Sequence, residues 1–566
     1  MRIRRHAMLA HFVNRSKALI FAALLGTLCA VNAHAERSTV CTVTVNSPDE
    51  REIFRKMLPT ERFQFVELVE RGRPDWLASA CMQGVRCDVL VISGHFDGGT
   101  EFYSDRVDAR ESLPVEELER ASCSQSCSGL FSQLKEVYLF GCNTLNPATV
   151  ESTAAEVARS LVRAGYAPAD AEQVAHTLNA AHGESNRDGM RRIFADVPVI
   201  YGFPGQAPLG ASAGPTLGRY LQATSSRDVA SGRASSALLG AFSASSMAVA
   251  AGMSSADPGA GYRRDVCQFF DEGLSPAQRL AFIHALLQRG MAEVRMFFER
   301  IEAFDAALSD EQRAAPDFVR ELDRIAADEL ARDRYLGFAR DVDRPPVRAR
   351  MIHWAARLGW LTAAQENDDL ARLVTQMLAN RSMVSADVEL ICSLNREREL
   401  ERSVVEGRRH WAKDEATDAK VAHSAALACL GHADARQRVL SALTGREVDD
   451  VDVAQVYLRH RPINDVRELR AIAAAIPRMT ESAAQVRALD TLAHYYLADR
   501  ESLAELAKLF PRAASVSVQR AIAGVFIRSD YRAVAQLDLV QMLRRYRIKS
   551  PDGEDMIDVL IRRLQA

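Results

Sequence analysis

The segment Val89–Ser93, Val-Leu-Val-Ile-Ser, is the feature that most constrains how this chain can fold. Four consecutive apolar residues followed by a Gly-rich turn signal are typical of a strand buried on both faces, as in a parallel sheet covered by helices. His95 follows this segment after a single glycine, where the strand would leave the sheet. Open α/β folds bind their ligands at this carboxyl edge. A histidine at such a place can equally be a loop residue with a local hydrogen bond.

A second short run, Glu136–Phe140, repeats this pattern and ends on Gly141 and Cys142. Its β-forming residues predict another strand, which would bring Cys142 to the same sheet edge as His95. The thiolate is the nucleophilic form of cysteine, and a nearby imidazole that accepts its proton generates it. The pair therefore predicts His95 as general base and Cys142 as nucleophile. Taken alone, Cys142 can also be read as a small buried apolar residue.

The segments "VLVISGHF" and "VYLFGCNT" together resemble the caspase-like, or clan CD, cysteine peptidases, and most of all their CHAT-type branch. In those proteins the catalytic histidine and cysteine follow two adjacent parallel strands in that chain order. The resemblance extends to Val197–Phe203 as the next strand and to Ala213–Leu221 in the following helix. It implies an α/β fold with a mainly parallel sheet, and it carries over only His95 and Cys142 as site residues.

The sequence departs from the family next to the histidine. The family usually has a glycine there, whose backbone N–H helps to bind the oxyanion, whereas this chain has Phe96. Because every residue except proline has a backbone N–H, we expect the amides of Phe96 and Cys142 to form the oxyanion hole. Class I glutamine amidotransferases fit the sequence less well, since they place the cysteine before the histidine.

The resemblance implies hydrolysis of a peptide bond in a protein or peptide substrate, without a cofactor. Asp97 is a candidate for binding a basic substrate side chain, although an acidic loop residue is often only solvated. Tyr201 and Phe203 end the third predicted strand. They are candidates for an apolar wall of the substrate site, with a place in the core as the alternative.

The first 35 residues have the pattern of a secretory signal peptide. Basic residues precede the apolar run Ala18–Val31, and Ala33–Ala35 supplies small residues for cleavage. The run is shorter than the roughly 20 residues of a spanning helix, so we expect no membrane span after cleavage. A periplasmic or extracellular location follows. Cleavage would change the net charge from −3 to about −8, which disfavours nucleic acid as a partner.

Nine of the ten cysteines lie beyond the expected signal peptide. In an oxidising compartment most of them should pair, and an odd number leaves at least one thiol free. Cys81 with Cys87, and Cys123 with Cys127, are candidate local bridges, although spacing does not fix the connectivity. Zinc binding by Cys123 and Cys127 competes with this pairing, but no second ligand pair with suitable spacing follows, so we predict no metal site. Cys142 is the strongest candidate for the free thiol.

The composition changes near Asp257, where a stretch rich in Gly, Ala and Ser ends. We expect a caspase-like α/β domain over 36–256 and an α-helical repeat domain over 257–566. In the second part, amphipathic segments recur about every 30 to 35 residues, which predicts helix pairs stacked as a solenoid. HEAT-like repeats are the nearest resemblance, and an irregular helical bundle is the alternative.

Two functions follow from this organisation. One is a secreted or periplasmic cysteine endopeptidase with a His-Cys dyad, whose helical repeats bind protein, either the substrate or a regulatory protein. The other is a catalytically inactive caspase-like scaffold whose repeats mediate protein–protein interaction. A free Cys142 favours the first function, and a disulfide-bonded or buried Cys142 favours the second.

Overall fold

The computed structural model describes residues 37–68, 77–96, 99–104, 111–148, 158–159, 161–162, 166–182, 185–224, 228–380, 382–401, 404, 420–548 and 555–565. The expected signal peptide, residues 1–35, and the candidate Asp97 lie outside these ranges. The chain divides into two compact units, residues 1–325 and 326–566. The first contains the sheet, and the described part of the second is all-helical.

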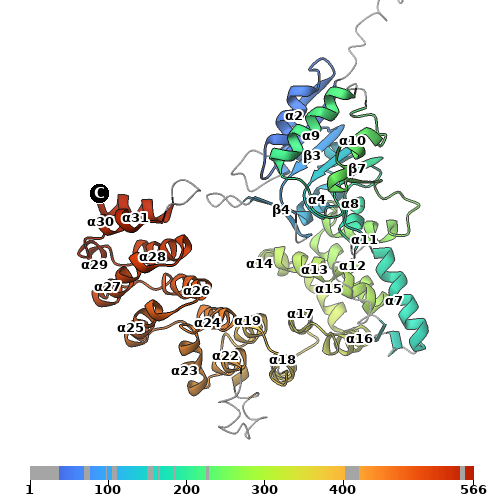
Figure 1. The fold of residues 1–566 in the computed structure, drawn as a ribbon. Helices are drawn as coiled ribbons and strands as arrows, with labels where there is room; N and C mark the ends of the chain where they lie inside the picture. The colour runs from blue at the N-terminus through green and yellow to red at the C-terminus, as the bar shows by residue number, and fades with distance from the viewer. Residues whose placement is uncertain are drawn as a thin grey trace, which may run out of the picture. The chain divides into compact units, whose positions relative to one another are not determined.

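A six-stranded sheet with the order β2-β1-β3-β6-β7-β8 forms the centre of the first unit (Figure 1). Its strands are β1 (Ser38–Thr44), β2 (Phe63–Glu67), β3 (Val89–Ser93), β6 (Glu136–Phe140), β7 (Val199–Gly202) and β8 (Ala248–Ala250). All neighbouring pairs are parallel except β7 and β8. The expected mainly parallel α/β sheet is therefore present. The two apolar runs that precede His95 and Cys142 form β3 and β6, which are adjacent.

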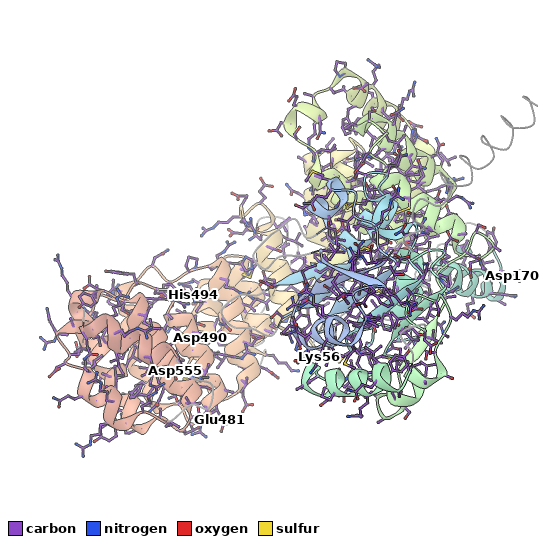
Figure 2. All side chains as sticks on the ribbon, turned by 90° about the horizontal axis from the view of Figure 1, so that it is seen from above. Lys56, Asp170, Glu481, Asp490, His494 and Asp555 are labelled. Carbon is purple, nitrogen blue, oxygen red and sulfur yellow. A yellow bond between two sulfur atoms is a disulfide. The ribbon has the colours of Figure 1, made fainter. Side chains whose placement is uncertain are left out.

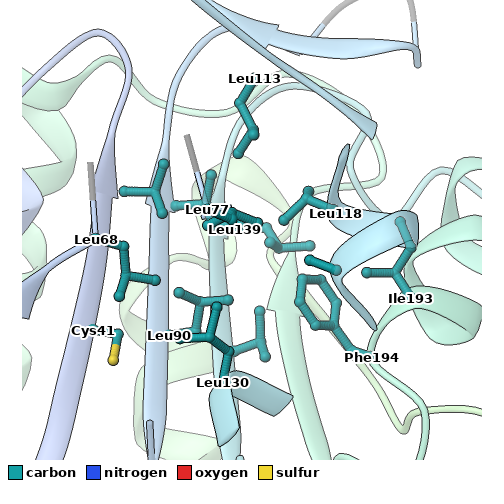
Figure 3. Packing of buried hydrophobic residues seen from close by; sticks show 14 of the residues in the cluster. Cys41, Leu68, Leu77, Leu90, Leu113, Leu118, Leu130, Leu139, Ile193 and Phe194 are labelled. Atoms are coloured by element: carbon teal, nitrogen blue, oxygen red, sulfur yellow. The ribbon is translucent and has the colours of Figure 1, made fainter. Parts of the chain in front are cut away.

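Helices cover both faces of this sheet, which explains why β3 and β6 are buried along their whole length. One face packs against α2 (Asp49–Met57), α9 (Gly210–Ala223) and α10 (Ser236–Ala241). The other face packs against α3 (Ala78–Met82), α4 (Val115–Cys123), α5 (Ser128–Phe131) and α8 (Asn186–Ile193). Figure 3 shows part of this second core, where Leu90 and Leu139 of the strands meet Leu118 and Ile193 of the helices.

Four disulfides join cysteines of neighbouring elements, in the pairs Cys41–Cys87, Cys81–Cys127, Cys123–Cys267 and Cys392–Cys429. The expected local bridges Cys81–Cys87 and Cys123–Cys127 are therefore wrong. Cys81 and Cys123 instead pair across packed helices, α3 with the start of α5 and α4 with α11 (Ala260–Phe270), and Cys87 bonds Cys41 of β1. Cys142 is the free cysteine among the described residues.

A group of helices after the sheet still belongs to the first unit. It comprises α11 (Ala260–Phe270), α12 (Pro276–Arg289), α13 (Met291–Ala307), α14 (Asp310–Arg313) and α15 (Pro316–Ala326), while α7 (Pro168–His182) lies before β7 and contacts α13. The Cys123–Cys267 disulfide ties α11 to α4. The buried Glu119 of α4 pairs with Arg192 of α8 and Arg300 of α13, at 3.3 and 2.7 Å. The compact unit therefore continues past the expected boundary at 256/257, which falls between β8 and α11.

The second unit is a succession of helices, which are α16 (Glu329–Arg340), α17 (Pro345–Arg357), α18 (Ala363–Leu378), α19 (Ser385–Leu394), α22 (Val421–Cys429), α23 (Ala433–Ala442), α24 (Val448–His460), α25 (Val466–Ala475), α26 (Ser482–Leu492), α27 (Arg500–Leu509), α28 (Val516–Arg528), α29 (Tyr531–Ala535), α30 (Val540–Tyr546) and α31 (Met556–Gln565). Along one layer α22, α24, α26, α28 and α31 each pack on the next, and α25, α27 and α29 do so beside them.

Consecutive helix pairs of this unit share a local interaction. The buried Gln485 of α26 donates its side-chain amide to the Ile476 carbonyl (3.0 Å), and Gln519 of α28 donates to the Phe510 carbonyl (3.1 Å). Glu481, just before α26, and Asp490, on α26, are exposed (Figure 2). A buried apolar layer with such recurring contacts is the expected consequence of stacking helix pairs that cannot bury their apolar faces alone.

Among the described residues, no helix is long and apolar enough to cross a membrane.

The four disulfides are compatible with a periplasmic or extracellular location, since such bonds persist in oxidising compartments.

Candidate functional site

A pocket lies at the carboxyl edge of the parallel strands. It is lined by residues 93–95 after β3, residues 140–142 at the end of β6, residues 207–210 before and at the start of α9, and Asn46, Ser47 and Glu50 after β1. It encloses about 360 Å³ of empty space, part of it open to solvent. The structure thus brings His95 and Cys142 to one pocket, at the sheet edge where α/β folds bind ligands.

His95 is held by backbone interactions on both sides. The Gly94 N–H donates to the Phe140 carbonyl (3.1 Å), which continues the β3–β6 pairing to the residue before His95. His95 and Tyr103 then exchange two backbone hydrogen bonds of 2.9 Å. Tyr103 ends β4 (Glu101–Tyr103), which pairs with β5 (Ser112–Pro114), and its ring lies 5.3 Å from the imidazole. This hairpin fixes the half-buried imidazole at the pocket.

Cys142 lies at the start of a tight turn after β6. The residue is half-buried, and its sulfur accepts a hydrogen bond from the Ala207 N–H (3.4 Å). The next residue, Asn143, has the left-handed φ of 59° and donates its N–H to the Gly205 carbonyl (2.7 Å). The buried Thr144 hydroxyl donates to the Gly141 carbonyl (3.1 Å). The turn is therefore pinned on both sides of the thiol, as a positioned nucleophile requires.

Gly141 allows this turn to pack closely against the histidine loop. A Cβ at this position would lie 2.9 Å from the Gly94 carbonyl oxygen and 2.9 Å from the Phe96 Cβ. Phe96 itself is fully buried, with its ring 4.6 Å from Phe102. This aromatic side chain thus anchors the residue after His95 in the core. A role of the Phe96 and Cys142 amides as oxyanion hole stays a prediction.

Two of the candidate substrate residues, Tyr201 and Phe203, do not reach the pocket. Tyr201 and Phe203 are buried in the core between the sheet and α9, and neither lines the pocket. The Tyr201 hydroxyl accepts a hydrogen bond from the Ser235 N–H (2.8 Å). Phe203 donates its N–H to the Thr144 hydroxyl (3.0 Å), so it supports the turn after Cys142 rather than the pocket wall.

Glu50 is a pocket residue that the sequence analysis missed. It lies in the first turn of α2 and is 2% exposed. Burial raises the pKa of Glu50 to about 7, although a hydrogen bond with Ser93 acts in the opposite direction. The signal for its position was the helix-start sequence Ser47-Pro48-Asp49-Glu50 shortly after β1, which places the acidic first turn of α2 at this sheet edge without showing which of its carboxyl groups is buried.

Leu209 is a second residue missed from the sequence. It precedes α9 and lines the pocket with 68% of its side chain exposed. A glycine follows it because a side chain at Gly210 would overlap Ser47. The close contact of α9 with the start of α2 therefore closes one wall of the pocket.

The pocket combines a thiol, an imidazole and a buried carboxyl, with no lysine or arginine among its lining residues. Within the described parts of the chain, no group of three or more His, Cys, Asp or Glu side chains is arranged to hold a metal ion. The groups present suit nucleophilic attack by sulfur with proton transfer by imidazole.

No protein-family model matches the chain, and no match was found among curated proteins or solved structures. Any function proposed for this chain therefore rests on its own residues.

Proposed function

We propose that the chain is a cysteine endopeptidase that uses a His95–Cys142 dyad. The observation that carries this proposal is the convergence of the free Cys142 and His95 in one pocket, at the carboxyl ends of two adjacent parallel strands. This arrangement argues for the enzyme over the inactive scaffold, because Cys142 is free and only half-buried, and its sulfur is held in place by the Ala207 N–H.

The proposed reaction is acyl transfer to sulfur followed by hydrolysis. His95 accepts the thiol proton of Cys142, and the sulfur attacks the carbonyl carbon of the peptide bond. His95 then gives the proton to the leaving amine as the C–N bond breaks, which leaves a thioester. Water, deprotonated by His95, hydrolyses the thioester and restores the thiol. The oxyanion of each tetrahedral intermediate would accept hydrogen bonds from the Phe96 and Cys142 amides.

The order of the elements supports a caspase-like first unit. In caspase-like peptidases the catalytic histidine follows one strand and the catalytic cysteine follows the adjacent parallel strand, later in the chain. His95 after β3 and Cys142 after β6 have the same arrangement. The second unit, with its stacked helix pairs, is proposed to be HEAT-like and to bind a protein substrate or regulator. Both units would act in the periplasm or outside the cell.

Hydrolysis of a peptide library tests this function. The mature protein is incubated with a mixture of peptides that covers all residue types on both sides of the cleaved bond, and new termini are identified by mass spectrometry. We expect cleavage by the native protein and none by Cys142→Ala. His95→Ala should lower the rate by at least about 100-fold, the usual contribution of a general base.

His494→Ala is the matched control, because His494 lies exposed on the helical unit (Figure 2). This variant should cleave like the native protein. Cleavage that persists in Cys142→Ala, or absence of cleavage of any peptide by the native protein, would contradict the proposal.

A further inference from the structure

We propose that Glu50 binds a cationic side chain of the substrate, lysine or arginine, on the residue whose carbonyl Cys142 attacks. The inference rests on the proposed peptidase function and adds the substrate class to it. It is carried by a buried carboxyl group that faces the same pocket as the thiol and the imidazole.

The carboxyl group of Glu50 has unused hydrogen-bonding capacity. Its side chain is 2% exposed, and within the described part of the chain its Oε2 atom has no hydrogen-bond partner. Ser93 is the side-chain hydrogen-bond partner of the carboxyl group. A buried carboxyl oxygen without a partner costs free energy. We therefore expect a hydrogen-bond donor of the ligand to bind this oxygen.

Among the described residues, no lysine or arginine lines the pocket beside Glu50. The nearest basic residue in sequence, Arg51, is engaged by Glu67 at 3.2 Å and by Glu52 at 2.8 Å. The neighbouring Asp49 is exposed and has the same sign as Glu50. The titratable groups that line the pocket with Glu50 are His95 and Cys142. The described lining therefore offers Glu50 no basic side chain, and a cationic ligand would supply the positive charge.

The shape of the pocket suits a long side chain with an apolar stem. Ala207, Pro208, Leu209 and Phe140 provide apolar lining, and Leu209 is 68% exposed whereas Glu50 is 2% exposed. The lining therefore combines an exposed apolar side chain with a buried carboxyl group. Lysine and arginine combine an apolar stem with a charged end, which matches these two kinds of surface.

This carboxyl group should also bind a cation more strongly than it binds a neutral group. Because burial raises the pKa of Glu50 to about 7, the empty pocket disfavours its ionised form near neutral pH. An ammonium or guanidinium group stabilises that form, and the resulting charge-assisted hydrogen bond is about twice as strong as a neutral one.

Peptidyl chloromethyl ketones test this proposal without a known substrate. They alkylate a reactive cysteine with loss of chloride, and the rate at Cys142 is followed by mass spectrometry. Two probes are compared that differ only in lysine or its uncharged analogue norleucine next to the reactive group. We expect the lysine probe to react about tenfold faster or more with the native protein, as one charge-assisted contact predicts.

In Glu50→Gln, which keeps the size of the side chain and removes its charge, the ratio of the two rates should fall to near one. The matched control Glu61→Gln removes an exposed carboxylate that does not line the pocket and should keep the native ratio. Equal rates for the two probes in the native protein would overturn the proposal. A lysine preference that survives in Glu50→Gln would overturn it as well.

Failure of the peptidase function itself has a different signature. In that case neither peptide probe labels Cys142, although iodoacetamide does. Small thiosulfonate reagents, one carrying an ammonium group and one a sulfonate, then measure whether Glu50 attracts cations to Cys142. A rate advantage for the ammonium reagent that disappears in Glu50→Gln would support cation binding by Glu50. Equal rates for the two reagents in the native protein, or an ammonium advantage that stays the same in Glu50→Gln, would contradict cation binding by Glu50.

Discussion

Glu50 keeps a carboxyl group at the sheet edge where burial penalises its charge. Its pKa is raised from 4.5 to about 7, so between these pH values the folded chain holds a proton that the unfolded chain has lost. The stability of the native protein should therefore fall as pH rises from 4.5 to 7 and then level off. Relative to it, Glu50→Gln should gain about 3 kcal/mol between pH 4 and pH 8.

Urea unfolding with the disulfides intact, repeated across this pH range, measures the difference. The exposed Glu61→Gln is the control and should follow the native curve. A constant difference between Glu50→Gln and the native protein would show that the carboxyl is not held in its neutral form.

Gly141 is the residue at which added volume should do most harm to the site. In Gly141→Ala the new methyl group would meet the Gly94 carbonyl and the Phe96 side chain, both at 2.9 Å. We expect a loss of about 1 to 3 kcal/mol of stability, together with slower alkylation of Cys142. Gly240→Ala is the control, because nothing lies within 4 Å of a Cβ at that position in α10. An unchanged melting temperature and alkylation rate in Gly141→Ala would contradict this packing.

The positions of His95 and Cys142 could be predicted because each follows an apolar strand, and parallel strands end at one edge. Glu50 could not be predicted in this way. Its helix carries acidic residues at Asp49 and Glu52 as well, and the sequence does not show which of the three is buried. Tyr201 and Phe203 were open to two readings because an aromatic residue at a strand end packs equally well in a pocket wall or in the core.

The helices that surround the sheet are joined by a buried charge cluster. Glu119 of α4 lies between Arg192 of α8 and Arg300 of α13. Burial alone would raise the pKa of Glu119, but the two guanidinium groups outweigh it and hold that pKa below its ordinary value. Removing the carboxylate leaves two arginines without their partner.

We therefore expect Glu119→Gln to lower stability by about 3 kcal/mol or more. Glu117→Gln removes a carboxylate from the same helix, but its pair with Arg120 is half-exposed, so the loss should stay below about 1 kcal/mol. Unfolding in urea at neutral pH compares the two. Equal losses would mean that the buried cluster contributes no more than a surface ion pair.

Apolar periodicity predicted the strands and helices, but it did not predict which cysteines form disulfides between them. Cys81 lies nearer in sequence to Cys87, but it bonds Cys127 because α3 and α5 are packed together. Sequence spacing carries no information on which helices meet across a sheet face. The free cysteine was predictable from the odd number of cysteines and from its place after a strand.

In the whole chain, the last strand of the sheet and the end of the first compact unit lie at different places in the sequence. The composition marks the first near residue 257, whereas contacts of α11 and α13 with α4 extend the unit to Ile325. A fragment of residues 36–325 should therefore fold with a reactive Cys142.

A fragment of residues 36–256 should be less stable, because it lacks Cys267 and Arg300 and leaves Cys123 and Glu119 without these partners. Urea unfolding and alkylation of Cys142 distinguish the two fragments. If the shorter one matched the longer in both measurements, the added helices would be independent of the sheet.

Activation of Cys142 by His95 can be measured with a small alkylating reagent. The unreduced mature protein is treated with iodoacetamide at mildly acidic pH, and each cysteine is followed by mass spectrometry. We expect fast labelling at Cys142, slowed about tenfold or more in His95→Ala and unchanged in His494→Ala, because an adjacent imidazole generates the reactive thiolate. Equal rates in the native protein and in His95→Ala, or a Cys142 that resists labelling, would contradict this activation.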